Sequence, residues 1–277
     1  MTVKDILVAL TSYPEPTPVS VVEDAVSVAS ALGAHIAALS CEMHVQVPGH
    51  FISGAAVGLP GVIAGETGKS RRNAQDLLAA FENAAAKSGV SRESILQKCW
   101  SFEAPDLLVE YARLRDLTIM AESNDRWYAE AVIFGSGKPT LILPQIPRPQ
   151  PFELGTIAVA WDFSRAAARA VSDALPLLEK AKKVRVITVL NEKVLDRKHS
   201  AEELSKNLSR HGIDVVLDRV DAKGEPIGHV LEAFVASHAT DLLVMGAYGH
   251  SRLREFVLGG ATKSLLSKPP LPILFSH

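Results

Sequence analysis

Three glycines near the carboxyl terminus, Gly246, Gly249 and Gly259, have a spacing that suits the binding of an anion by backbone groups. They follow the apolar residues 241–245 (DLLVM), which predict a buried parallel strand. Residues 253–258 predict the start of a helix that carries the last of these glycines in its first turns. Backbone N–H groups at a helix start can face a phosphate, and glycine lets it approach without a Cβ clash. The pattern therefore predicts a phosphate site.

Asp162 is the second residue whose position suggests chemistry, because it follows the predicted strand 157–161 (IAVAW). In an open parallel sheet, ligands bind beyond the carboxyl ends of the strands where the winding reverses. The Asp162 carboxylate could accept hydrogen bonds from a ribose or a base while the glycine loop holds phosphates. The alternative, that Asp162 only caps a helix or forms a turn, stays open, but its pairing with the glycine loop favours a ligand.

The elements that position these residues occur twice, on either side of a proline-rich segment. Residues 144–151 (PQIPRPQP) contain four prolines, which exclude helix and sheet interior and favour an extended linker. We predict domains over residues 1–144 and 152–277, joined by a linker over 145–151. The strands predicted in the first domain match those of the second in the same order, which indicates a tandem duplication. The matched segments are 6–10 with 157–161, 115–120 with 240–245, and 139–143 with 272–275.

The second half alternates strands with helices. Ser164 can cap a helix, residues 184–190 predict a strand, and residues 201–211 predict a helix that ends at Gly212. A strand over 213–217 and a helix starting at Pro226 follow. This alternation predicts an α/β fold with a parallel sheet and helices on both faces.

The first half departs from this plan through an insertion over residues 41–70, which we expect to be a flexible loop or a cover for the neighbouring half. Its last six residues, GETGKS, do not form a P-loop motif, because the pattern requires glycine where Ile63 stands. His44 and His50 have no third ligand at a useful spacing, so no metal site is predicted there.

Composition narrows the classes of function. Lys and Arg number 29 against 31 Asp and Glu without a basic block, which argues against nucleic-acid binding. No apolar run is long enough to span a membrane, and the first residues lack the features of a signal peptide, so we expect a cytoplasmic protein. Cys41 and Cys99 offer neither a disulfide framework nor a C-x-x-C pair and are expected to be buried thiols.

The second half resembles the universal stress protein family in VAWDFS (residues 159–164), GEP (224–226), ATDLLVMGAYGHS (239–251) and LPILF (271–275). The first half resembles it more faintly. The resemblance implies an α/β fold of two tandem open, doubly wound parallel five-stranded sheets of order 3-2-1-4-5, of the adenine nucleotide alpha hydrolase-like type. It also implies that an adenine nucleotide such as ATP, with or without Mg²⁺, binds in the second half.

By this resemblance, Ala160, Asp162 and Val189 hold the nucleoside, and the phosphates lie against Gly246, Gly249 and the region of Gly259. The remaining candidate residues line the same loop and helix start: Met245, His250, Ser251, Arg252, Gly260, Ala261 and Thr262. Nucleotide-binding members usually carry Ser or Thr where this chain has Gly260. One side-chain hydrogen bond, worth about 0.5–1.5 kcal/mol, is therefore missing, and weaker binding is expected.

The first half lacks these features and is interpreted as a degenerate copy kept for packing. Thr11 replaces the aspartate, residues 121–124 (AESN) replace the glycine loop, and Glu122 would repel phosphate. The glycines of residues 135–137 (GSG) survive. We expect the two halves to pack as a pseudo-two-fold pair, and a further homodimer stays open.

The leading functional hypothesis is a stress-response or regulatory module that binds an adenine nucleotide in its second half and acts on an unknown protein partner. A nucleotide-free interaction protein with a relic glycine loop is the alternative. An enzyme such as an ATP pyrophosphatase is a third, but residues 161–164 (WDFS) are not the Ser-Gly-Gly-rich loop it needs. No nucleophile elbow or acid–base pair occurs, so no catalytic residue is predicted.

Overall fold

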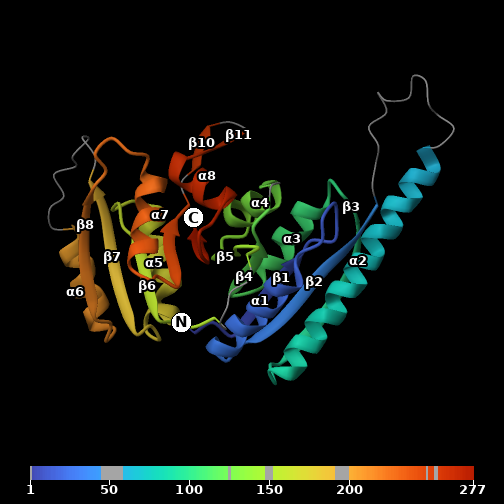
Figure 1. Cartoon of the computed structure of the whole chain (residues 1–277), viewed down its shortest axis with the longest axis horizontal. Helices are drawn as coiled ribbons and strands as arrows, with labels where there is room; N and C mark the ends of the chain where they lie inside the picture. The colour runs from blue at the N-terminus through green and yellow to red at the C-terminus, as the bar shows by residue number, and fades with distance from the viewer. Residues whose placement is uncertain are drawn as a thin grey trace.

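The computed structural model describes residues 2–44, 59–123, 126–146, 152–190, 200–247, 249–252 and 255–277. The side chains of residues 59–60, 200, 249–252 and 255–258 are outside this description. A central sheet runs through the whole chain, with helices packed against both of its faces (Figure 1).

The first half contributes five strands and four helices to the described part of the chain. They are β1 (Asp5–Leu10), α1 (Val19–Leu32), β2 (His35–His44), α2 (Leu59–Lys87), β3 (Arg92–Trp100), α3 (Ala104–Arg113), β4 (Leu117–Ala121), α4 (Trp127–Gly135) and β5 (Thr140–Leu143).

The second half repeats this series and adds a short hairpin. Its elements are β6 (Thr156–Ala160), α5 (Arg165–Leu178), β7 (Lys183–Leu190), α6 (Ser200–Arg210), β8 (Val215–Asp221), α7 (Ile227–Ser237), β9 (Leu242–Gly246), β10 (Gly249–Arg252), β11 (Glu255–Leu258), α8 (Gly260–Ser267) and β12 (Ile273–Ser276).

The main sheet has ten strands in the order β3-β2-β1-β4-β5-β12-β9-β6-β7-β8. Each half is parallel and has the order 3-2-1-4-5, so the predicted fold class is confirmed. The two sheets join where β5 pairs antiparallel with β12, with Leu141 opposite Leu274. This pairing supports the pseudo-two-fold arrangement proposed from the sequence, and it removes two apolar strand edges from solvent.

Two hydrophobic cores lie on opposite faces of the sheet. One contains buried side chains of α1, α2, α5 and α6, and the other those of α3, α4, α7 and α8. Each core crosses the seam between the halves, because Leu141 and Leu274 belong to the first and Ile142 and Phe275 to the second. The β-branched and leucine-rich strands are buried on both faces, as a sheet covered by helices on both sides requires.

The predicted insertion over residues 41–70 is strand at one end and helix at the other, and residues 45–58 lie outside the described residues. Residues 41–44 continue β2, and residues 59–70 are the first turns of α2, which rises beyond the end of β2 (Figure 1). Ser70 anchors this helix because its Oγ accepts from the N–H of Met43 at 2.9 Å and lies 2.9 Å from the Oγ of Ser12. The segment GETGKS is therefore helical and forms no phosphate loop.

Two predicted boundaries in the second half were wrong. The strand expected over residues 213–217 runs later, as β8, because Ile213 closes the end of α6 by donating its N–H to the carbonyl of Leu208. Gly212 has φ = 77°, as this helix end requires. The helix expected to begin in residues 253–258 begins at Gly260, since β11 pairs with β10 in an antiparallel hairpin.

The domain boundaries stay predictions. The described part of the linker covers residues 145–146, and residues 147–151 lie outside the described residues. Both cysteines, Cys41 and Cys99, are free and buried, as expected. Along the described chain, no helix has the length and apolar character to cross a membrane.

Candidate functional site

A cavity of about 250 Å³ lies in the second half, at the carboxyl ends of β6, β7 and β9. The amino-terminal ends of α5, α7 and α8 surround it. This is where the winding of the sheet reverses, the place expected for a ligand in a doubly wound fold. Its walls are Ala160, Trp161, Asp162, Ser164, Ala167, Ile187, Val189, Ile227, Leu231, Met245, Gly246, Gly259, Gly260, Ala261 and Thr262.

The structure brings together nine of the thirteen residues proposed from the sequence. Those nine are Ala160, Asp162, Val189, Met245, Gly246, Gly259, Gly260, Ala261 and Thr262. Gly249 and residues 250–252 form β10, directly after this part of the chain. The side chains of His250, Ser251 and Arg252 lie outside the described residues, so their proposed contacts stay predictions.

Sequence reasoning missed the apolar walls contributed by Ile187, Ile227 and Leu231. Ile227 and Leu231 are one turn apart on α7, and the apolar stripe of that helix was visible in the sequence. The apolar stripe alone does not show which of its residues face a ligand and which pack in the core. Together with Val189 and Met245, these side chains offer an apolar wall suited to a planar base.

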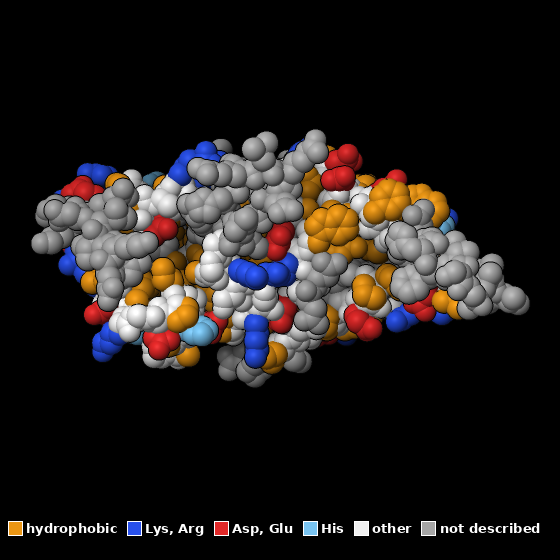
Figure 2. All heavy atoms as spheres, turned by 90° about the horizontal axis from the view of Figure 1, so that it is seen from above, with side chains coloured by type: hydrophobic (Ala, Val, Ile, Leu, Met, Phe, Trp, Pro, Cys, Tyr) orange, Lys and Arg blue, Asp and Glu red, His pale blue; other side chains and the backbone are white. Residues whose placement is uncertain are grey.

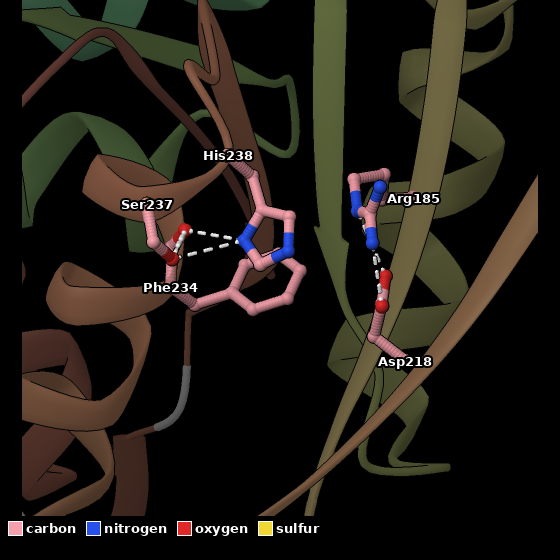
Figure 3. Close-up of polar contacts among 5 residues, drawn as sticks. All are labelled: Arg185, Asp218, Phe234, Ser237 and His238. Carbon is pink, nitrogen blue, oxygen red and sulfur yellow. Dashed lines mark hydrogen bonds and ion pairs between the residues drawn. The ribbon is translucent and has the colours of Figure 1, made fainter.

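The position of α7 beside the cavity is fixed at its opposite end by a polar cluster (Figure 3). Arg185 on β7 donates from Nε and Nη2 to the two carboxylate oxygens of Asp218 on β8, at 2.9 and 2.6 Å. The guanidinium of Arg185 lies 5.7 Å from the ring centre of Phe234 on α7, and the His238 ring stacks on Phe234 at 4.1 Å. Through these contacts the cluster connects α7 with β7 and, by way of Arg185, with β8.

Asp162 is exposed at the cavity and has a local role as well. Its Oδ1 accepts the N–H of Ser164 at 2.9 Å, while the Oγ of Ser164 accepts the N–H of Ala167 at 3.0 Å and caps α5. The turn that the sequence left open as an alternative is therefore present. A carboxylate held by one oxygen at a cavity wall can still accept hydrogen bonds from ligand hydroxyls.

The start of α8 presents backbone donors to the cavity. Gly259 is its extended N-cap, with φ = −61° and ψ = 146°, and its carbonyl accepts from Lys263 at 2.9 Å. The N–H groups of Gly260 and Ala261 lie in the first turn, before Lys263 donates the first hydrogen bond within the helix. Such a helix start carries a partial positive charge and suits an anion.

Gly246 has a packing role in addition to its predicted role at the phosphates, which stays a prediction. A Cβ built on it would lie 2.5 Å from both the carbonyl carbon of Ala166 and the backbone nitrogen of Ala167. Glycine is therefore required here so that the end of β9 can approach the first turn of α5. Gly260 is different, because a Cβ there would meet no atom within 4 Å.

In the first half, side chains pack together at the corresponding strand ends. Cys41, Met43, Cys99 and Ala104 form a buried cluster at the ends of β2 and β3, and half-buried Tyr13, Leu107 and Tyr128 pack around it. Seen from above, hydrophobic side chains gather over this half, whereas Lys and Arg side chains are scattered among acidic ones (Figure 2). The first half thus resembles the second in fold and differs from it at the site.

In the described part of the chain, no three His, Cys, Asp or Glu side chains come together as a metal site. The fold and the cavity together define a doubly wound α/β protein in two tandem halves, with a cavity at the switch point of the second half.

Comparison with known proteins agrees with this class. Residues 153–277 match the sequence model of the universal stress protein family. A universal stress protein from Synechocystis sp. (strain ATCC 27184 / PCC 6803 / Kazusa) is 47% identical over 51 residues, which cover 17% of this chain and 18% of that protein. The matched segment thus spans about a fifth of the curated relative.

Solved structures share the fold over the whole chain. A universal stress protein from Archaeoglobus fulgidus DSM 4304 is 15% identical, with a TM-score of 0.70 and 98% of each chain covered. A functionally unknown protein from Pseudomonas aeruginosa PAO1 is 13% identical, with a TM-score of 0.58 and coverage of 99% of this chain and 92% of that one. Residues 153–277 thus match the universal stress protein family, and the solved structures show that the whole chain has this fold, with two similar halves in tandem.

Proposed function

We propose that the second half binds one adenine nucleotide, such as ATP, and that the protein is a stress-response module that this ligand regulates. The observation that carries the proposal is the cavity itself. It combines an apolar wall, the exposed carboxylate of Asp162 and the start of α8 in one space of about 250 Å³. These features suit a base, a ribose and a phosphate respectively.

The filled first half supports a single site for each chain. Cys41, which corresponds to the cavity wall residue Val189, is buried with Met43 and Cys99 in a packed cluster. A nucleotide in the first half would have to displace these side chains from a packed cluster. We therefore expect one nucleotide per chain, bound in the second half.

Calorimetric titration of the full-length chain with ATP, ADP and AMP tests this proposal. We expect a stoichiometry of one, and Asp162→Ala should weaken binding by about 10- to 100-fold, since a hydrogen bond to a charged group contributes about 1.5–3 kcal/mol. Asp162→Asn keeps an oxygen for the turn with Ser164 and removes the charge. It should weaken binding by less than Asp162→Ala.

Thr11→Ala, the equivalent change in the first half, is the control and should leave the affinity unchanged. Two nucleotides per chain would contradict the single-site proposal. Wild-type affinity in Asp162→Asn and Asp162→Ala would show that the carboxylate contacts no ligand.

Gly260→Ser should tighten nucleotide binding. The side chain has room, because a Cβ on Gly260 meets no atom within 4 Å and its φ is not positive. A serine hydroxyl at the start of α8 could add one hydrogen bond to a phosphate, which amounts to about tenfold or more in affinity. Gly260→Ala adds the Cβ without the hydroxyl and should leave the affinity near that of the parent.

An interaction module without nucleotide is the second candidate, and exposed aromatic residues on the first half favour it. Trp100, Phe102 and Trp127 are 41%, 53% and 51% exposed, and the rings of Trp100 and Phe102 stack at 6.4 Å. Aromatic residues at a surface are typical of protein interfaces. If neither the parent nor Gly260→Ser binds a nucleotide at millimolar concentration, this function replaces the first.

A further inference from the structure

Three sulfur-bearing side chains meet on one face of the sheet in the first half. On the paired strands β2 and β3, Cys41 lies opposite Gln97 and Met43 lies opposite Cys99. Because side chains alternate along a strand, Cys41, Met43 and Cys99 project from the same face. They are 3%, 3% and 6% exposed and belong to one packed cluster, which we call the sulfur cluster.

One residue of the sulfur cluster corresponds to a wall residue of the cavity in the second half. Thr11 is aligned with Asp162, and each first strand pairs with the second strand of its own half. The pairings of Leu10 with Ser40 and of Ala160 with Ile187 therefore align the second strands of the two halves. Cys41 then matches Val189, a wall residue of the cavity. At this position the first half has a thiol where the second half has a valine side chain.

The two thiols and the thioether pack in one buried cluster, with Cys41 two residues before Met43 on β2 and Cys99 opposite Met43 on β3. A cation coordinated by these sulfurs would be shielded from solvent by the same packing.

The strand register favours an ion over a disulfide. Diagonal neighbours on paired strands have Cα atoms about 7–8 Å apart, at or beyond the limit of about 7 Å for a disulfide without backbone movement. A metal ion extends the reach, because each metal–thiolate bond is about 2.3 Å long. Met43, directly opposite Cys99, supplies a third sulfur on the same face.

Helix α3 starts against this cluster. Ala104, its first residue, is fully buried there, and Leu107 packs beside it. The positive end of a helix dipole stabilises thiolates, as it does other anions. This is a second feature, independent of the thiols, that suits a negatively charged metal–thiolate group.

We propose that Cys41, Cys99 and Met43 bind one soft monovalent metal ion, Cu(I). Thiolate and thioether donors select Cu(I), whereas a structural Zn²⁺ site requires a fourth ligand. Both thiols release their protons to solvent and become thiolates, the Met43 thioether is a neutral third donor, and no electron is transferred. The resulting group carries a net charge of −1 next to the start of α3.

The test uses the reduced full-length protein under anaerobic conditions, titrated with tetrakis(acetonitrile)copper(I) in competition with bicinchoninate. We expect one Cu(I) per chain and an ultraviolet charge-transfer band of copper thiolate. Cys41→Ser and Cys99→Ser should each weaken binding by more than about 100-fold, the upper range for altering a residue that merely supports a ligand. Met43→Leu should weaken it by about tenfold.

Met120→Leu is the matched control, because Met120 is a buried methionine on β4 that belongs to another core. It should bind Cu(I) as the parent does. Met43→Leu changes the shape of the side chain little, so this variant tests the site even if a serine variant fails to fold. X-ray absorption of the copper-loaded parent should show three sulfur neighbours. The proposal is overturned if the parent binds no Cu(I), if Cys41→Ser/Cys99→Ser binds it equally well, or if equimolar Zn²⁺ displaces it.

Discussion

Gly246→Val should destabilise the protein by at least about 3 kcal/mol, beyond the usual range for adding methylene groups to a packed core. Even the Cβ alone would lie 2.5 Å from two backbone atoms of α5 and 2.8 Å from the Cβ of Ala166. Backbone atoms of a packed helix cannot move aside as a flexible side chain can. Urea denaturation followed by circular dichroism should show the lower midpoint, and nucleotide binding should be lost with the fold.

Gly260→Ala is the matched control, since it adds the same atom to a glycine of the same cavity where no atom lies within 4 Å. It should keep the parental midpoint within about 0.5 kcal/mol, as is usual for a change with no structural conflict. A Gly246→Val variant that is fully stable yet binds no nucleotide would contradict the packing role and support the phosphate role predicted from the sequence.

Gly246 shows how far the sequence could predict the site. The residue type and its place after a strand were sufficient to put it at the cavity, and it does line the cavity. Its physical role depends on how closely β9 approaches α5, a tertiary distance that no local pattern contains. The same applies to Asp162, where the sequence could name both a turn and a ligand role but not that one oxygen already holds the turn.

The fold was predictable where local preference and tertiary packing agree. Apolar, β-branched runs such as residues 157–160 and 184–190 became strands, and the order 3-2-1-4-5 came from the family resemblance. The prediction failed where packing overrides preference. Helix α2 contains Gly61, Gly65 and Gly68, which disfavour a helix, yet Ser70 fixes its course against β2.

The sulfur cluster was not visible in the sequence. Cys41 and Cys99 were correctly expected to be buried, but a spacing rule for metal ligands detects only ligands that lie close together in the sequence. Their contact arises from the register of β2 and β3, which sets Met43 opposite Cys99 across a parallel pair. A parallel pair joins segments separated by a helix, so such sites need the topology before they can be recognised.

Leu141→Ala and Leu274→Ala should each destabilise the whole chain by about 2–5 kcal/mol, the range for removing a buried leucine side chain. Both residues are fully buried and lie opposite each other where β5 pairs with β12. Because they are in contact, the double variant should differ from the sum of the singles by about 0.5–3 kcal/mol. Urea denaturation of the four proteins measures this coupling.

Leu208 is the comparison site, because it is equally buried but lies on α6, far from the seam in the sheet order. Leu141→Ala combined with Leu208→Ala should be additive within about 0.5 kcal/mol. Additivity for Leu141 and Leu274 as well, or two separate unfolding transitions, would mean that the halves fold independently.

If the whole chain unfolds in a single transition, a ligand bound in the second half stabilises the first half as well. A nucleotide at 100 times its dissociation constant adds about 2.7 kcal/mol to the stability of whatever unit unfolds with its site. With the halves coupled through β5 and β12, that unit includes the first half, its exposed aromatic residues and the sulfur cluster. Ligand binding in the second half would then protect amides of β1 and β2 from hydrogen exchange, although no ligand contacts them.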